Sequence, residues 1–202
     1  MRVTNRVDGL IEAGVHRVAG VSADELRDLA SGLTGSGILC VHPALAPASA
    51  LTPLLRLDGK PGFVVEDMTD LDEFADIAGV DIPDRPLYLV ENVDRGDDLI
   101  GWTPNAALPE LLARGRTPLT INEGISWLLQ EPDRLEANRC FMCVGSRKRR
   151  GRGLDARTPA IWISRGTGRD GVARRGAPKV GWCWAGNHHD WLGFASGVGR
   201  RG

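Results

Sequence analysis

Apolar residues near the start of the chain recur with the three- and four-residue spacing of an amphipathic helix. The residues that share its apolar face are Val7, Leu10, Ile11, Val15 and Val18. Gly20 marks the expected end of this helix. A second helix is predicted from Ser22, because Glu25 stands at the fourth position of a capping box.

The middle of the chain alternates between contiguous apolar runs and a helical pattern. ILCV (38–41), GFVVED (62–67) and PLYLVENV (86–93) are typical of strands, and the last is apolar enough to be buried on both faces. A helix is predicted from Thr69 to about Ala78. Strand, helix and strand in that order predict one α/β unit.

Two more helices are predicted before Pro132. Asn105 is the expected cap of a helix through Leu112, and Thr120 with Glu123 forms a second capping box ahead of Trp127. Glu123 is therefore interpreted as a helix cap and not as a catalytic carboxylate.

Three short β-type runs follow: RCFMCV (139–144), PAIWIS (159–164) and PKVGWCW (178–184). Loops rich in arginine and glycine separate them, which indicates an antiparallel meander. Both faces of each run are apolar, so the sheet needs cover on both sides, and the helix at 120–130 is the nearest candidate. Val180, Trp182 and Trp184 share one face and are predicted to pack in a core.

These patterns predict a mixed α+β fold with N-terminal helices, a small α/β middle and a C-terminal antiparallel three-stranded meander. A chain of 202 residues fits a single domain, residues 1–202. Charge also allows a subdivision. Residues 1–130, an acidic α/β part, hold 20 Asp/Glu against 10 Lys/Arg, whereas residues 131–202, a basic β-rich part, hold 6 against 15. The two parts could attract each other, or the basic part could bind nucleic acid.

The cellular compartment is predicted from features that the sequence lacks. No run approaches the ~18 apolar residues of a membrane helix, and the first residues do not form a signal peptide. Four cysteines in this spacing do not indicate a disulfide framework. We expect a cytoplasmic protein with reduced thiols and no membrane partner.

Several motifs together resemble a known family. They are PLTINEGISWLLQ (118–130), NRCFMCVGSR (138–147), PAIWISRG (159–166) and PKVGWCWAGNHHDWLG (178–193), preceded by DRGDDLIGWTP (94–104). In order and spacing they are similar to an uncharacterised family of actinobacterial proteins, a domain of unknown function, over about residues 86–196. The resemblance implies no activity and no catalytic residues. The loops at 147–157 and 166–176 are longer and richer in arginine than the family pattern.

One cluster contains the residue types of a hydrolase. Cys183, His188, His189 and Asp190 could supply a thiol, an imidazole and a carboxylate. No local signature such as a nucleophile elbow accompanies them. Uniformly slow alkylation of the native thiols would exclude a nucleophilic cysteine.

A zinc knuckle at Cys140-x-x-Cys143 is disfavoured. Residues three apart on a strand point to opposite faces, so the two thiolates would not meet one ion. We expect no metal and no cofactor.

The basic loops are candidates for binding phosphate groups. Their residues are Arg147, Lys148, Arg149, Arg150, Arg152, Arg174 and Arg175. Four tryptophans lie nearby in the sequence and could stack on bases, although their position in apolar runs favours burial: Trp162, Trp182, Trp184 and Trp191. In a simple meander, however, successive loops lie at opposite ends of the sheet.

The sequence therefore favours a non-catalytic binding or interaction protein with a macromolecular partner, either another protein at the tryptophan-rich surface or nucleic acid at the arginine-rich loops. A hydrolase using the Cys183 neighbourhood is the alternative. The sequence does not determine the oligomeric state.

Overall fold

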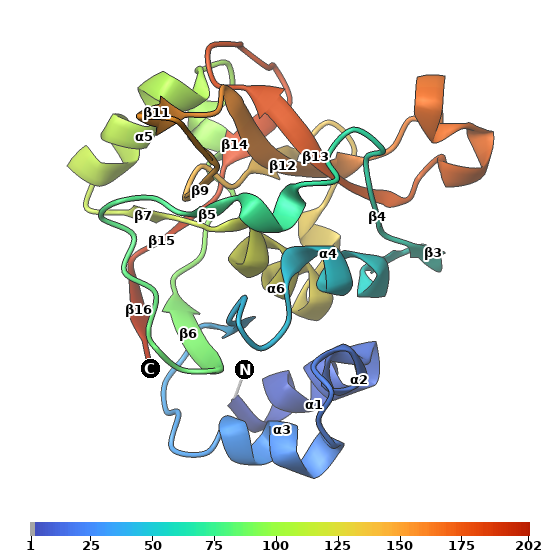
Figure 1. Cartoon of the computed structure of the whole chain (residues 1–202), viewed down its shortest axis with the longest axis vertical. Helices are drawn as coiled ribbons and strands as arrows, with labels where there is room; N and C mark the ends of the chain where they lie inside the picture. Colours follow the sequence, from blue (N-terminus) through green and yellow to red (C-terminus); the bar gives the residue numbers. More distant parts are fainter. Residues whose placement is uncertain (1–2) are drawn as a thin grey trace.

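A computed structural model describes residues 3–202 and contains helices and several sheets (Figure 1). The helices are α1 (Val3–Ala13), α2 (Val15–Val18), α3 (Ala23–Leu29), α4 (Ala48–Leu51), α5 (Pro104–Ala113) and α6 (Ile121–Gln130). The protein is thus of the mixed α+β class that the sequence predicts. No helix among the described residues is long and apolar enough to span a bilayer.

The largest sheet has five strands in the order β14 (Leu192–Phe194), β8 (Cys140–Met142), β12 (Arg157–Ile163), β13 (Pro178–Trp184) and β4 (Phe63–Val64). The three predicted strands β8, β12 and β13 are antiparallel neighbours, so the meander is confirmed. A strand also lies parallel to each edge of the meander, β14 beside β8 and β4 beside β13. The five-stranded sheet is thus the predicted three-stranded meander with one parallel strand added at each edge.

The other sheets are smaller. Three strands pair as β1 (Ile38–Val41), β6 (Leu87–Glu91) and β16 (Gly199–Arg201). Four two-stranded pairs join β2 (Arg56–Leu57) to β3 (Lys60–Pro61), β5 (Ala75–Asp76) to β9 (Ser146–Arg147), β7 (Thr117–Pro118) to β15 (Ser196–Gly197), and β10 (Arg149–Arg150) to β11 (Gly153–Leu154). Pairs such as β6 with β16 interleave the acidic and basic parts of the chain.

Helix α6 lies at the centre of the molecule. The predicted capping box is present: the Thr120 hydroxyl accepts the Glu123 N–H, and the Glu123 carboxylate accepts the Thr120 N–H at 2.8 Å. Gly124 lets α6 approach the sheet, because a Cβ there would lie 3.1 Å from Phe141 and 3.4 Å from Ile161. Trp127 packs on Phe141 with ring centroids 5.2 Å apart. The cover predicted for one face of the meander is therefore confirmed.

The buried end of Glu123 has a second role. Its carboxylate, with no exposed surface, accepts hydrogen bonds from Arg200 at 2.6 Å and from the Tyr88 hydroxyl at 2.9 Å. The last strand of the chain is thereby tied to the central helix. An unpaired carboxylate at this depth would be strongly unfavourable, so Arg200 is a structural partner.

Two helix predictions need correction. In place of a helix from Thr69 there is only a 3-10 turn, Leu71–Glu73. The carboxylates of this segment bond to distant groups, for example Asp72 to the backbone N–H of Ser49 at 2.9 Å, and these tertiary contacts outweigh the local helical pattern. The cap of α5 is Thr103 and not Asn105, because Pro104 occupies the first helical position.

The predicted α/β unit is also wrong. Strand β4 belongs to the five-stranded sheet, whereas β6 belongs to the three-stranded sheet. The predicted core face of β13 is correct only in part, because Val180 is buried, Trp182 is half-buried and Trp184 is 48% exposed.

Candidate binding pocket

The two faces of the five-stranded sheet differ in what covers them. Phe141 and Ile161 point toward α6, so Val180, the partner of Ile161 in register, and Trp182 share that inner face. Trp162 and its direct partner Lys179 point to the opposite, outer face. This outer face is left open over Trp162, where a pocket forms.

The wall of this pocket is aromatic. The rings of Trp162 and Trp191 meet edge to face with centroids 6.1 Å apart, and both side chains are half-buried. The Trp162 ring reaches across the adjacent strand because Gly181 has no side chain: a Cβ there would lie 2.5 Å from the ring. The Lys179 ammonium stands 5.0 Å from the centroid of Trp162, within the range of a cation–π interaction.

Polar groups converge at the floor of the pocket. The Asp170 carboxylate accepts hydrogen bonds from the Lys179 ammonium and from the Ser164 hydroxyl, both at 2.8 Å. Burial alone would raise the pKa of Asp170, but the two donors outweigh it and lower the pKa. The Asp170 carboxylate therefore stays ionised at neutral pH, and it holds the Lys179 ammonium against the ring of Trp162.

The pocket has a volume of about 340 Å³. Besides the residues above, Asn138, Cys140, Arg165 and Thr167 contribute to its lining. Its rim is the connection from Ser164 to Ala177, which carries Arg165, Arg169, Arg174 and Arg175 against the single acid Asp170. A flat apolar surface beside an excess of positive charge suits a ligand that combines a ring with an anionic group.

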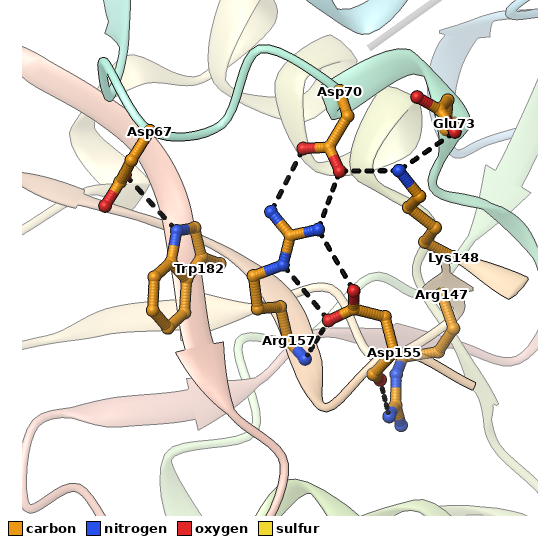
Figure 2. A network of polar contacts seen from close by, with 8 residues as sticks. All are labelled: Asp67, Asp70, Glu73, Arg147, Lys148, Asp155, Arg157 and Trp182. Carbon is orange, nitrogen blue, oxygen red and sulfur yellow. Dashed lines mark hydrogen bonds and ion pairs between the residues drawn. The ribbon is translucent and has the colours of Figure 1, made fainter. Parts of the chain in front are cut away.

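The opposite end of the sheet is closed by an ion-pair network, shown in Figure 2. The Arg157 guanidinium is paired with Asp70 at 2.6 Å and with Asp155 at 3.0 Å. Phe74 and Trp182 flank it at 5.3 and 6.0 Å. Through its hydrogen bonds, Arg157 holds the pKa of Asp70 far below its usual range.

Two basic side chains of the first loop already have partners in this network. Arg147 is buried and donates to the Asp155 carbonyl at 2.7 Å. Lys148 pairs with Asp70 at 2.7 Å and with Glu73 at 2.9 Å. Neither side chain is free to bind a phosphate group.

The remaining members of the predicted basic set lie at different places. Arg149, Arg150 and Arg152 are exposed on the β10–β11 hairpin. In the second loop, Arg174 stacks 4.4 Å from the ring of Phe63, and Arg175 is exposed. Because β12 connects the two loops, they lie at opposite ends of the sheet, as expected for a meander (Figure 1).

The residues of the hydrolase hypothesis lie near one another in the sequence, but no hydrogen bond within residues 3–202 joins the Cys183 thiol to His188 or His189. Burial raises the pKa of Cys183 to about 12, which keeps the thiol protonated. His188 contacts the Gly101 carbonyl at 2.6 Å through Nδ1, and Asp190 is exposed. The ring of His189 packs against Trp191, and burial lowers the pKa of this histidine. The geometry thus lacks the activated nucleophile that a hydrolase of this type needs.

The cysteines of the CxxC motif diverge. Cys140 donates a weak hydrogen bond to the Glu136 carbonyl at 3.5 Å. Cys143 is buried where the sheet faces α6, beside Gly124. In the described part of the chain, no three His, Cys, Asp or Glu side chains gather as metal ligands.

Sequence reasoning missed two polar residues of the pocket, Lys179 and Asp170. One signal was available, since Lys179 is a charged residue inside an otherwise apolar strand. A charge at such a position needs a partner or an open face. The partner came from a loop nine residues away, which periodicity does not reveal.

An α+β protein with a tryptophan-walled pocket is thus the class that fold and site define. The chain belongs to the family of unknown function DUF5701, which it matches over residues 9–202. The expected family membership is confirmed, and it extends beyond residues 86–196 into the N-terminal helices. The actinobacterial origin stays a prediction. No curated protein and no solved structure gives a significant match to the chain.

Proposed function

We propose that this protein is a non-catalytic binding protein and that its macromolecular partner is single-stranded nucleic acid. The observation that carries the proposal is the pocket of Trp162 and Trp191 beside the arginine-bearing 164–177 loop. An aromatic face for a base and guanidinium groups for the backbone are the two elements by which proteins hold single strands.

Charge and size both agree with this partner. Lys179 is held against Trp162 by Asp170, and Arg165 adds a cation to the lining. A pocket of about 340 Å³ has room for one unstacked base. A duplex would keep its bases stacked and out of reach, so single strands should bind more tightly than duplexes.

The test is fluorescence anisotropy with a labelled ten-nucleotide oligothymidylate at low salt. We expect saturable binding that weakens as salt rises, because bound phosphates release counterions. Trp162→Leu should lower the affinity about tenfold or more, since stacking of one base contributes ~1–3 kcal/mol.

Trp184 provides a matched control. It is a tryptophan 48% exposed on the inner face of the same sheet, away from the pocket. Trp184→Leu should leave the affinity unchanged. Equal losses in both variants, or no saturable binding at low salt, would contradict the proposal. If an acidic peptide displaces the oligonucleotide at lower concentration, the partner is a protein.

A further inference from the structure

A second cavity lies at the N-terminal end of α6, between α4 and the segment that carries Leu71 and Phe74. We call it the α6 cavity. It has a volume of about 140 Å³. Its lining includes Leu71, Phe74, Ile82, Ile121, Asn122 and Ser146. None of these residues belongs to the Trp162 pocket.

The walls of the α6 cavity are mostly apolar. Leu71, Phe74 and Ile121 are each at most 4% exposed, and Ile82 is half-buried. An engineered apolar cavity of ~150 Å³ in another protein takes up benzene. The α6 cavity therefore suits an apolar group about as large as one benzene ring.

One wall of the cavity is polar and has hydrogen-bonding capacity to spare. In the first turn of α6, Ser146 accepts the Ile121 N–H at 3.0 Å and Thr120 accepts the Glu123 N–H. The Asn122 N–H between them has no acceptor within residues 3–202. The Ser146 hydroxyl hydrogen has none either, although this residue is only 1% exposed.

The Asn122 side chain adds an acceptor. Both hydrogens of its amide nitrogen are used, by the Val41 carbonyl at 3.2 Å and by the Ala46 carbonyl at 2.9 Å. Its Oδ1 accepts no hydrogen bond from any described residue, and the residue is 4% exposed. Two residues of the lining, Asn122 and Ser146, thus leave two donors and one acceptor unused, which is the complement of a carboxamide.

Charge excludes an anion. Asp72 and Asp76 are exposed at the mouth of the cavity, and no Lys or Arg contributes to its described lining. A carboxylate would meet these acids, and it could not donate to Asn122 Oδ1. An amidinium would satisfy Oδ1 and the acids, but it has no oxygen to accept from the Asn122 N–H and the Ser146 hydroxyl.

From this arrangement we infer that the α6 cavity is a binding site for a small neutral carboxamide attached to a benzene-sized apolar group. The carboxamide oxygen accepts from the Asn122 N–H and the Ser146 hydroxyl, its nitrogen donates to Asn122 Oδ1, and the apolar group fills the space between Phe74 and Ile82. Binding here is independent of the nucleic-acid proposal.

Three isosteric probes test the inference: benzamide, benzoate and benzamidine. Titrations followed by amide NMR should show a saturable shift of the Asn122 resonance with benzamide. The dissociation constant for benzamide should be at least about tenfold lower than that for either charged analogue, because one unmade hydrogen bond in a buried site costs ~1–3 kcal/mol. Tightest binding of benzoate or of benzamidine, or no shift at Asn122 with millimolar benzamide, would overturn the inference.

Variants separate a binding role from a structural one. Ser146→Ala should weaken benzamide binding about fivefold or more and leave the binding of toluene, which needs no polar partner, unchanged; equal losses for both probes would refute the assigned hydrogen bond. Ile82→Trp should fill the cavity and abolish binding of both probes. Should Ile82→Trp fail to fold, the contrast between benzamide and toluene in Ser146→Ala still decides. Trp162→Leu should bind benzamide normally, whatever its affinity for oligonucleotides.

Discussion

The two arginine-rich connections of the five-stranded sheet have similar compositions and different surroundings. At one end, Arg147 donates to the Asp155 carbonyl of its own loop, and Lys148 and Arg157 pair with Asp70 (Figure 2). At the other end, Arg165 and Arg175 are exposed beside the Trp162 pocket. A run of basic residues is thus available to bind an anionic ligand only where the fold leaves its charges unpaired.

The ion pairs of the protein also bear on the uneven distribution of charge along the chain. The acidic part supplies Asp70 and Glu73 to Lys148, and Glu123 to Arg200. Attraction between the two parts, one of the two interpretations of the charge pattern, is therefore present as ion pairs. The excess that remains is concentrated in the second loop and on the β10–β11 hairpin.

The largest expected effect comes from removing one partner of the Arg157 ion-pair network. We call the end of the sheet that this network closes the closed end, and the end beside the Trp162 pocket the open end. Arg157→Met would leave Asp155, at 9% side-chain exposure, without its ion-pair partner, and would leave Asp70, at 18%, paired with Lys148 alone. We expect the free energy of unfolding to fall by about 3 kcal/mol, as for other ion pairs that lose one partner in a buried setting. Denaturant unfolding measures it. The matched variant Arg165→Met, at the open end, should change stability by less than ~0.5 kcal/mol. Equal effects at the two ends would remove the contrast.

The second-largest effect is expected for a substitution beneath the Trp162 pocket. Gly181→Ala would place a methyl group 2.5 Å from Trp162 and 3.0 Å from Val65. Such overpacking costs about 1–3 kcal/mol. We also expect weaker oligonucleotide binding, because Trp162 must move. Gly186→Ala, in the following turn with nothing within 4 Å of the new Cβ, is the control. Unchanged stability and affinity of the Gly181 variant would show that the ring does not depend on this glycine.

A smaller effect is expected on oligonucleotide affinity when the arginines at the two ends of the sheet are replaced separately. Replacing Arg165, Arg174 and Arg175 by Ser should lower the affinity for oligothymidylate about tenfold at low salt and flatten its salt dependence, by ~0.7 in the logarithmic slope for each phosphate that is no longer neutralised. Replacing Arg149, Arg150 and Arg152 by Ser removes the same charge from the hairpin at the other end. Anisotropy titrations at several salt concentrations compare the two triple variants. If the hairpin variant binds as weakly, net charge and not the pocket governs binding.

The smallest effect is the acid sensitivity of the closed end. Because the folded-state pKa of Asp70 lies below its ordinary value of 3.8, the stabilisation is complete above that value and is lost as pH falls toward the folded-state pKa. Stability should therefore decrease below about pH 4, by no more than ~1.4 kcal/mol per pH unit for this carboxylate. Arg157→Met should reduce the slope, as measured by unfolding between pH 5 and pH 3. An unchanged slope would mean that other carboxylates control it.

The sequence predicted those parts of the candidate site that depend on local pattern. It predicted both strands that carry Trp162 and Lys179, and it separated the two loops by the geometry of a meander. It did not predict the ion pair between Lys179 and Asp170, and it predicted that Trp182 and Trp184 pack in a core. The exposure of Trp184 depends on where the covering segments end, and strand alternation carries no information about that.

Local patterns were sufficient where the interaction that stabilises an element lies within the element. The capping boxes at Ser22 and Thr120 and the apolar strands β1, β6, β8, β12 and β13 are of this kind. Tertiary structure alone decided the parallel edges formed by β4 and β14, the 3-10 turn at 71–73 and the two cavities. In each of these, backbone groups or carboxylates bond to residues far along the chain, and such long-range partners outweigh the weak preference of a short segment.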